Sequence, residues 1–176
     1  MALNENTRVK IHAILHLCRL GYDYASLSQA KRDESTNIFT DIFADSILRI
    51  NPDIDESDIK KVYENVALAL DNEDLGEAFS NMLTATSGIK LIDFKNFKNN
   101  SFHVVTELAY KNGDDEFRPD ITLLVNGMPL AFIEVKKPNN HEGILAERDR
   151  INTRFKNKKF RKFINISQIL VFSNNM

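Results

Sequence analysis

The chain has 176 residues, 43% of them hydrophobic and 27% charged, which suits one compact domain with a buried core and excludes disordered and collagen-like proteins. No apolar run approaches the ~18 residues of a membrane span, and a single cysteine, Cys18, excludes an internal disulfide and fits a reducing cytoplasmic compartment. The net charge of −2 hides an asymmetry, because residues 136–162 hold ten Lys/Arg against three Asp/Glu.

The first part of the chain has helical periodicity with recognisable stop and start signals. Gly21 is suited to end a first helix, and Asn51-Pro52 ends a second. Asp55 and Glu56 precede a third, beside its electropositive end. The predicted helices cover about Thr7–Leu20, Ser35–Arg49, Ser57–Leu70 and Glu73–Thr86. We expect residues 1–72 to form an N-terminal helical region and residues 73–176 to form the core.

After residue 88 the pattern changes to that of strands, rich in β-branched and aromatic residues. Asn126-Gly127 is the strongest hairpin signal in the sequence. Strands are predicted over Ile89–Phe94, Phe102–Tyr110, Arg118–Val125, Pro129–Lys136 and Gln168–Ser173, with a basic helix over 142–162. This order predicts an α/β (α+β) fold, a mixed sheet flanked by helices, and a chain that continues in a longer protein.

The segment 118–136, RPDITLLVNGMPLAFIEVK, carries charged groups in otherwise apolar strands. With a plain two-residue Asn-Gly loop, Asp120 and Glu134 fall on opposite faces of the hairpin. One extra loop residue, or a bulge near residues 126–129, sets them directly opposite each other with Cβ atoms ~5 Å apart. That register also collects the apolar residues on one face. We therefore predict it, with Lys136 on the face of the carboxylates.

Two carboxylates at this spacing repel each other unless a cation lies between them. Oxygen ligands suit Mg²⁺, which keeps several waters and takes one or two carboxylates plus phosphate oxygens. The predicted ligands are therefore Asp120, Glu134 and the backbone carbonyl of Val135. Lys136 is predicted to orient or deprotonate the attacking water, or to neutralise charge on a phosphate. The alternative is a surface salt bridge, which the apolar character of both strands disfavours.

At these residues the sequence resembles a known family. Pro119-Asp120, thirteen intervening residues and Glu134-Val135-Lys136 match the PD-(D/E)xK nuclease motif. The stretch RPDITLLVNGMPLAFIEVKKP and the segment ILAERDRINTRFKNKKFRKFINISQILVFSNNM resemble the N-terminal nuclease region of the restriction (R, or motor) subunit of type I restriction enzymes. The resemblance is strong over residues 100–176 and weak over the first 70.

This resemblance implies a Mg²⁺-dependent endonuclease core that cleaves double-stranded DNA, an ATP-driven translocase further along the chain, and methyltransferase and specificity subunits as partners. The sequence has no GxxxxGK[ST] phosphate loop, so ATP is expected only at motor domains outside it. The family suggests Glu77 as an extra metal ligand, against the simpler reading of a solvated glutamate, and Glu107 is similarly undecided. Where many relatives carry Gln-x-x-x-Tyr, Arg148 and Asn152 are the positional candidates here.

The basic run 148–162 has phenylalanines interleaved with its cations, which is typical of a helix packed on one side and facing phosphates on the other. A solvated helix face is the alternative. A non-catalytic module that binds DNA or another subunit and retains the nuclease fold is the alternative for the whole chain. The predicted DNA-binding residues are Arg148, Arg150, Arg154, Lys158 and Lys159.

Overall fold

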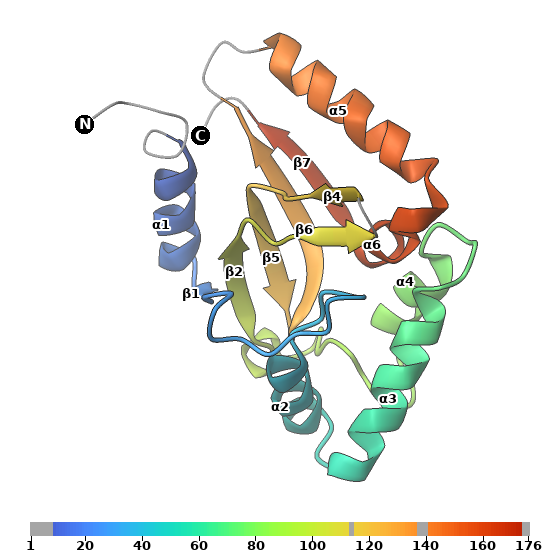
Figure 1. Ribbon diagram of the computed structural model, residues 1–176. Coiled ribbons are helices and arrows are strands. Elements are labelled where there is room, and N and C mark those ends of the chain that lie inside the picture. The colour runs from blue at the N-terminus through green and yellow to red at the C-terminus, as the bar shows by residue number, and fades with distance from the viewer. Residues whose placement is uncertain (1–8, 113–114, 137–140, 174–176) are drawn as a thin grey trace.

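The computed structural model describes residues 9–112, 115–136 and 141–173, and its helices surround a central sheet (Figure 1). Asp55 caps α3 as predicted, because its side chain accepts the backbone N–H of Ser57. No helix in the described ranges is both long and apolar enough to cross a membrane. The helices are α1 (Ile11–Arg19), α2 (Thr40–Ile50), α3 (Glu56–Ala69), α4 (Glu77–Leu83), α5 (His141–Phe155) and α6 (Arg161–Ile166), with 3-10 turns η2 (Phe97–Asn99) and η3 (Lys158–Phe160).

The sheet has five strands in the order β1-β2-β5-β6-β7. The pairs β1–β2 and β6–β7 are parallel, whereas β2–β5 and β5–β6 are antiparallel, so the sheet is mixed as predicted. A separate two-stranded hairpin is formed by β3 and β4. The strands are β1 (Asp23–Tyr24), β2 (Phe102–Thr106), β3 (Tyr110–Asn112), β4 (Asp115–Phe117), β5 (Ile121–Val125), β6 (Met128–Val135) and β7 (Ile169–Ser173).

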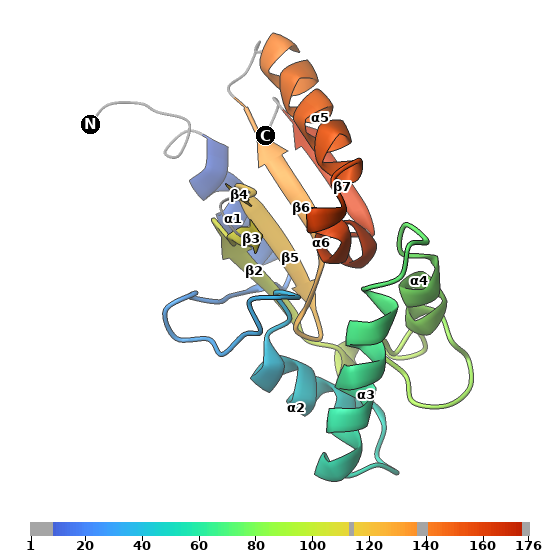
Figure 2. The same cartoon turned by 45° about the vertical axis from the view of Figure 1, so that its right-hand side comes forward.

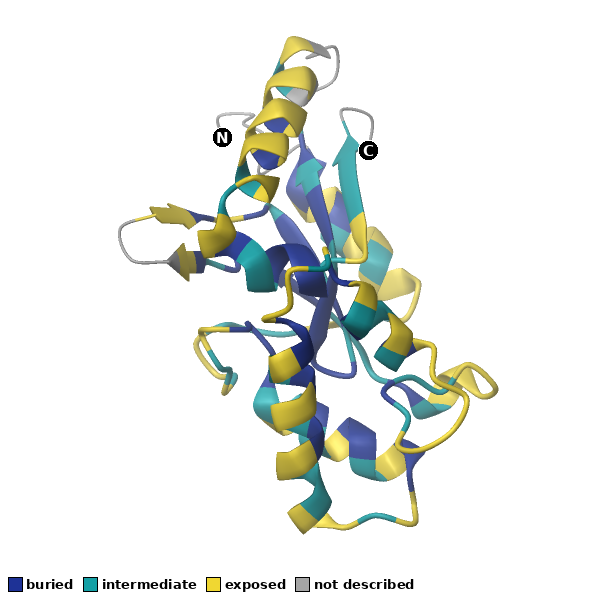
Figure 3. Ribbon diagram, turned by 90° about the vertical axis from the view of Figure 1, so that its right-hand side faces the viewer, coloured by how far each residue is buried: buried dark blue, intermediate teal, exposed yellow. Residues whose placement is uncertain are grey.

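Helices cover both faces of the sheet (Figure 2). On one face, Val9 and Ala13 of the α1 segment pack with Ile121, Ile133 and Val135. On the other face, a second apolar cluster joins the sheet to α5, η3, α6 and the β3–β4 hairpin. A third cluster joins α2, α3 and α4 to the turn end of β6, and the outward surfaces of α3 and α5 are exposed (Figure 3).

The β5–β6 hairpin turns at Asn126-Gly127, as the sequence predicts. Both residues have positive φ, and a Cβ on Gly127 would lie 2.6 Å from the carbonyl oxygen of Phe39. The backbone N–H of Phe39 also donates to the Gly127 carbonyl at 2.9 Å. The turn is therefore packed directly against the start of α2, which only glycine permits.

A β-bulge on β6 sets the register of this hairpin. Leu123 pairs with Ala131 while Leu124 pairs with Pro129, so Leu130 is the additional residue. The predicted bulge is therefore confirmed, although its additional residue lies one position beyond the predicted stretch 126–129. Beyond the bulge Ile121 pairs with Ile133, and the same pairing extended by one residue sets Asp120 opposite Glu134.

Several predicted boundaries differ from the structure. Residues 89–94 form bends instead of a strand: the backbone N–H of Lys90 donates to the Asn51 side chain, and the Asp93 side chain accepts the backbone N–H groups of Lys95 and Asn96 in a turn. The predicted strand 102–110 is interrupted after β2, where Glu107 has φ +55°. The second helix begins at Thr40, because residues 33–37 form a turn around the Asp33 carboxylate.

Candidate active site

Asp120 lies at the entrance to β5, beside the last residues of β6. Its Oδ2 accepts the backbone N–H of Val135 at 3.0 Å, and its Oδ1 lies 2.9 Å from the Nζ of Lys10. Lys10 also donates to Glu107. Both oxygens of Asp120 are thus engaged, which fixes the direction of the carboxylate. We call Lys10, Glu107 and Asp120 the α1-side cluster.

Lys10 has a side chain only 9% exposed, so its charge depends on these partners. Burial alone would lower the pKa of Lys10, but hydrogen bonds and negative charge from Glu107 and Asp120 outweigh it and raise the pKa. Lys10 therefore supplies a fixed positive charge beside Asp120. The sequence analysis missed this residue, which is separated from Asp120 by most of the chain.

Glu134 and Lys136 project from the same face near the end of β6, as predicted. The Nζ of Lys136 lies 2.8 Å from Oε1 of Glu134. Burial raises the pKa of the Glu134 carboxyl; the hydrogen bond from Lys136 opposes the rise and the charge of Asp120 adds to it. This electrostatic interaction between Asp120 and Glu134 agrees with the predicted juxtaposition of the two carboxylates.

A third carboxylate, Glu147 of α5, completes this part of the site. Its Oε2 lies 3.7 Å from the Nζ of Lys136 and 2.9 Å from a guanidinium nitrogen of Arg150. Its Oε1 lies 3.8 Å from Arg154, whose guanidinium stacks 4.1 Å above the centre of the Phe117 ring. We call Lys136, Glu134 and Glu147 the α5-side cluster.

A cleft of about 290 Å³ opens between α5, the end of β6 and the segment leading into β5. Glu134, Lys136 and Glu147 line it together with Arg150 and Arg154. A polar cleft with buried carboxylates and several positively charged side chains suits an anionic substrate that binds next to a metal cation.

Two carboxylates fit a hard divalent cation here: Glu134 lines the cleft, and Asp120 follows the lining residue Pro119. Asp120 and Glu134 supply carboxylate oxygens, and Mg²⁺ needs only one or two protein carboxylates when water and phosphate complete its shell. Across the described ranges, no group of three or more His, Cys, Asp or Glu side chains gathers as a potential metal site. The candidate site therefore relies on the Asp120–Glu134 pair, and the part predicted for the Val135 carbonyl stays a prediction.

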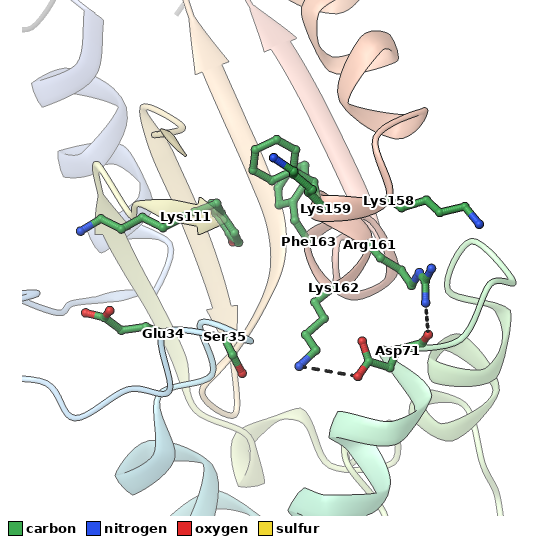
Figure 4. Close-up of a pocket in the computed structure, with 11 residues that line it drawn as sticks. Glu34, Ser35, Asp71, Lys111, Lys158, Lys159, Arg161, Lys162 and Phe163 are labelled. Carbon is green, nitrogen blue, oxygen red and sulfur yellow. Dashed lines mark hydrogen bonds and ion pairs between the residues drawn. The ribbon is translucent and has the colours of Figure 1, made fainter. Parts of the chain in front are cut away.

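Most of the predicted DNA-binding cations line three hollows that share lining residues. Arg150 and Arg154 line the cleft and also a neighbouring hollow of about 330 Å³, which includes Phe160. Phe160 also lines a third hollow of about 450 Å³, shown in Figure 4. The cations of this third hollow are Lys111, Lys158, Lys159, Arg161 and Lys162.

Three other sequence candidates lie away from the carboxylate pair or point outward. Glu77 is exposed at the start of α4, which packs on α6 near the turn end of β6, so the structure does not bring it to Asp120 and Glu134. Arg148 is exposed and pairs with its neighbour Asp149. Asn152 is also exposed, and neither it nor Arg148 lines the cleft, which α5 reaches with Glu147, Arg150, Ile151 and Arg154.

The family model described as Type I restriction enzyme R protein N terminus (HSDR_N) matches residues 2–176. The chain belongs to this family. The predicted resemblance to the N-terminal region of the R subunit is thereby confirmed.

Relatives of this R-protein N-terminus are much longer than the chain. It is 31% identical to the type I restriction enzyme MjaIXP endonuclease subunit of Methanocaldococcus jannaschii, over 99% of the chain and 19% of that relative. It is 27% identical to the type I restriction enzyme HindI endonuclease subunit of Haemophilus influenzae, over 77% of the chain and 15% of that relative. The chain thus spans less than one fifth of the length of either relative.

Proposed function

We propose that the chain is the endonuclease domain of a type I restriction R subunit and hydrolyses phosphodiester bonds of double-stranded DNA with Mg²⁺. The observation that carries this proposal is the bulged hairpin, which sets Asp120 opposite Glu134 with Lys136 on the same side. The names of the relatives, which are endonuclease subunits of type I restriction enzymes, support it.

In this proposal the chain's own groups hold and orient the reactants. Asp120 and Glu134 would hold Mg²⁺, and the backbone N–H of Val135, which donates to Oδ2 of Asp120, fixes the direction of that carboxylate. Bound Mg²⁺ would supply positive charge at the scissile phosphate and lower the pKa of water. Lys136 would orient the attacking water or neutralise charge developing on the phosphate, while Arg150 and Arg154 would hold the DNA backbone.

The wider setting follows from the family and is part of the same proposal. ATP-driven translocation would belong to motor domains elsewhere in the protein, and methyltransferase and specificity subunits would complete a cytoplasmic restriction complex. This chain would then supply DNA cleavage and neither ATP binding nor target recognition.

Three single substitutions in the intact restriction enzyme test the site. Asp120→Ala and Glu134→Ala each remove a ligand, and Lys136→Ala removes the cation beside the phosphate, so each should reduce DNA cleavage by about 10²-fold or more. ATP hydrolysis should continue in all three, measured as phosphate release in the same samples. Wild-type cleavage in any variant would refute the assignment, and loss of ATP hydrolysis would indicate a structural role instead.

The predicted DNA contacts have a separate test in the salt dependence of binding. Neutralising Arg150, Arg154, Lys158 and Lys159 together removes up to four phosphate contacts, and each should contribute about 0.9 to the slope of log affinity against log salt. Fluorescence anisotropy with a duplex in Ca²⁺ measures the slope. Lys60 and Lys61 on α3, exposed and distant in the fold, provide the control pair. An unchanged slope in the quadruple variant would place the DNA elsewhere.

A further inference from the structure

Glu147 is the least exposed of the carboxylates at or beside the cleft, with a side chain 9% exposed against 13% for Glu134, 20% for Asp120 and 31% for Glu116. It lies outside the Asp/Glu/Lys motif and comes from α5, a different element. A buried carboxylate is stable only when cations or hydrogen bonds compensate it. Glu147 has three such cations, and one of them is the motif lysine.

The position of the Lys136 ammonium reflects a competition between two carboxylates. It lies 2.8 Å from Glu134 and 3.7 Å from Glu147, so the contact with Glu134 is the closer one. Arg150 and Arg154 already compensate the charge of Glu147, which weakens its hold on Lys136. In this arrangement Lys136 forms an ion pair with an oxygen of Glu134 that a divalent cation would also bind.

DNA would change this balance, because Arg150 and Arg154 line the cleft and a phosphate is a strong, often bidentate partner for arginine. A phosphate that engages these two side chains takes them from Glu147. The uncompensated charge of Glu147 then attracts Lys136 more strongly. As the ammonium moves toward Glu147, the oxygen of Glu134 becomes available to a cation.

We propose that Glu147 is a positioning residue that couples DNA binding to divalent-cation binding by drawing Lys136 away from Glu134. This inference rests on the proposed function, since it takes Asp120 and Glu134 as the cation ligands. It gives Arg150 and Arg154 a second role besides holding the DNA backbone. By linkage, the cation would strengthen DNA binding by the same factor as DNA strengthens cation binding.

The experiment compares Ca²⁺ affinity of the chain, measured by titration calorimetry, without DNA and with a saturating duplex. DNA should raise the Ca²⁺ affinity of the wild type, and Glu147→Gln should reduce that increase by about fivefold or more. Glu116→Gln is the matched control, because Glu116 also lines the cleft but pairs with Arg118 and Lys111. An equal DNA effect in wild type and Glu147→Gln would overturn the proposal.

A second variant tests the coupling from the other side and does not depend on the folding of Glu147→Gln. Arg150→Gln removes one competitor for Glu147, so the DNA-free chain should bind Ca²⁺ severalfold more tightly. Arg118→Gln is the control, since Arg118 is a similarly exposed cation of the same cleft that pairs with Glu116. Equal Ca²⁺ affinities in the two arginine variants would also overturn the proposal.

Asp120→Ala separates this inference from the proposed function on which it rests. If Ca²⁺ binding is lost in Asp120→Ala but the DNA effect is unchanged in Glu147→Gln, the ligand pair stands and the role of Glu147 falls. If Asp120→Ala binds Ca²⁺ like the wild type, the ligand pair itself is wrong, and the coupling falls with it.

Discussion

The α1-side and α5-side clusters both compensate the charge of a largely buried lysine with carboxylates, but they do so in different ways. Each places one largely buried lysine between two carboxylates at the end of the β5–β6 hairpin. In the α1-side cluster, Lys10 comes from a distant segment that is anchored by the buried residues Val9 and Ala13. In the α5-side cluster, Lys136 follows Glu134 on the same strand and has a weaker second contact with Glu147. The first arrangement immobilises Asp120, whereas the second leaves Lys136 able to exchange partners.

The largest effect on stability should follow from removing the fixed lysine. Lys10→Met leaves Asp120 and Glu107 without their shared cation, which should lower the free energy of unfolding by about 1–3 kcal/mol. Added Mg²⁺ should restore more stability to this variant than to the wild type, because it replaces the missing charge. Thermal unfolding with and without Mg²⁺ measures both effects.

A control for this prediction is Lys31→Met, which removes an exposed lysine paired with Asp41 at 3.5 Å. Such exposed pairs contribute little, about 0–1 kcal/mol. If Lys10→Met is no less stable than Lys31→Met, the α1-side cluster does not hold Asp120, and the contrast between the two clusters disappears.

The two clusters also differ in what the sequence reveals. The α5-side pair could be predicted, because Glu134 and Lys136 are two residues apart on a strand and the apolar pattern of the hairpin selects the register that adds Asp120. Glu147 had a usable signal, since it lies four residues before Ile151 on a polar helix and so shares its buried face. The Gln-x-x-x-Tyr positions of the family instead predicted Arg148 and Asn152 as the accessory residues.

No local pattern could have identified Lys10. Its partner Asp120 lies 110 positions further along the chain, and only the packing of α1 on the sheet brings the two together. The boundary errors at residues 33–37 and 89–94 have a local cause instead, because the side chains of Asp33 and Asp93 form turns in segments whose apolar residues suggest helix or strand. Strands β2, β5, β6 and β7 could be predicted from periodicity and the Asn-Gly turn, whereas the two-residue strand β1 was not predicted.

A smaller, pH-dependent effect should come from Glu134. Its folded-state pKa is raised above the ordinary value of 4.5, chiefly by burial, so its contribution to stability is present below that pH and is lost as pH rises through the folded-state pKa. In EDTA, Glu134→Gln should therefore gain stability relative to the wild type as pH increases, with the difference smallest near pH 4. Melting temperatures of both proteins, measured as the pH is raised from about 4, follow this change in relative stability. A stability difference between Glu134→Gln and the wild type that is constant with pH would show that burial does not destabilise the ionised Glu134 carboxylate.

The smallest effect should come from Glu107, the exposed partner in the α1-side cluster. Its side chain is 49% exposed, and Lys10 keeps Asp120 when Glu107 is neutralised, so Glu107→Gln should change the free energy of unfolding by less than about 1 kcal/mol. The substitution keeps the side-chain length, and it leaves the backbone at φ +55° with a non-glycine residue as before. Urea unfolding of Glu107→Gln beside Lys10→Met gives the comparison directly. If the two variants lose equal stability, Lys10 is held mainly by Glu107, and the α1-side cluster does not immobilise Asp120.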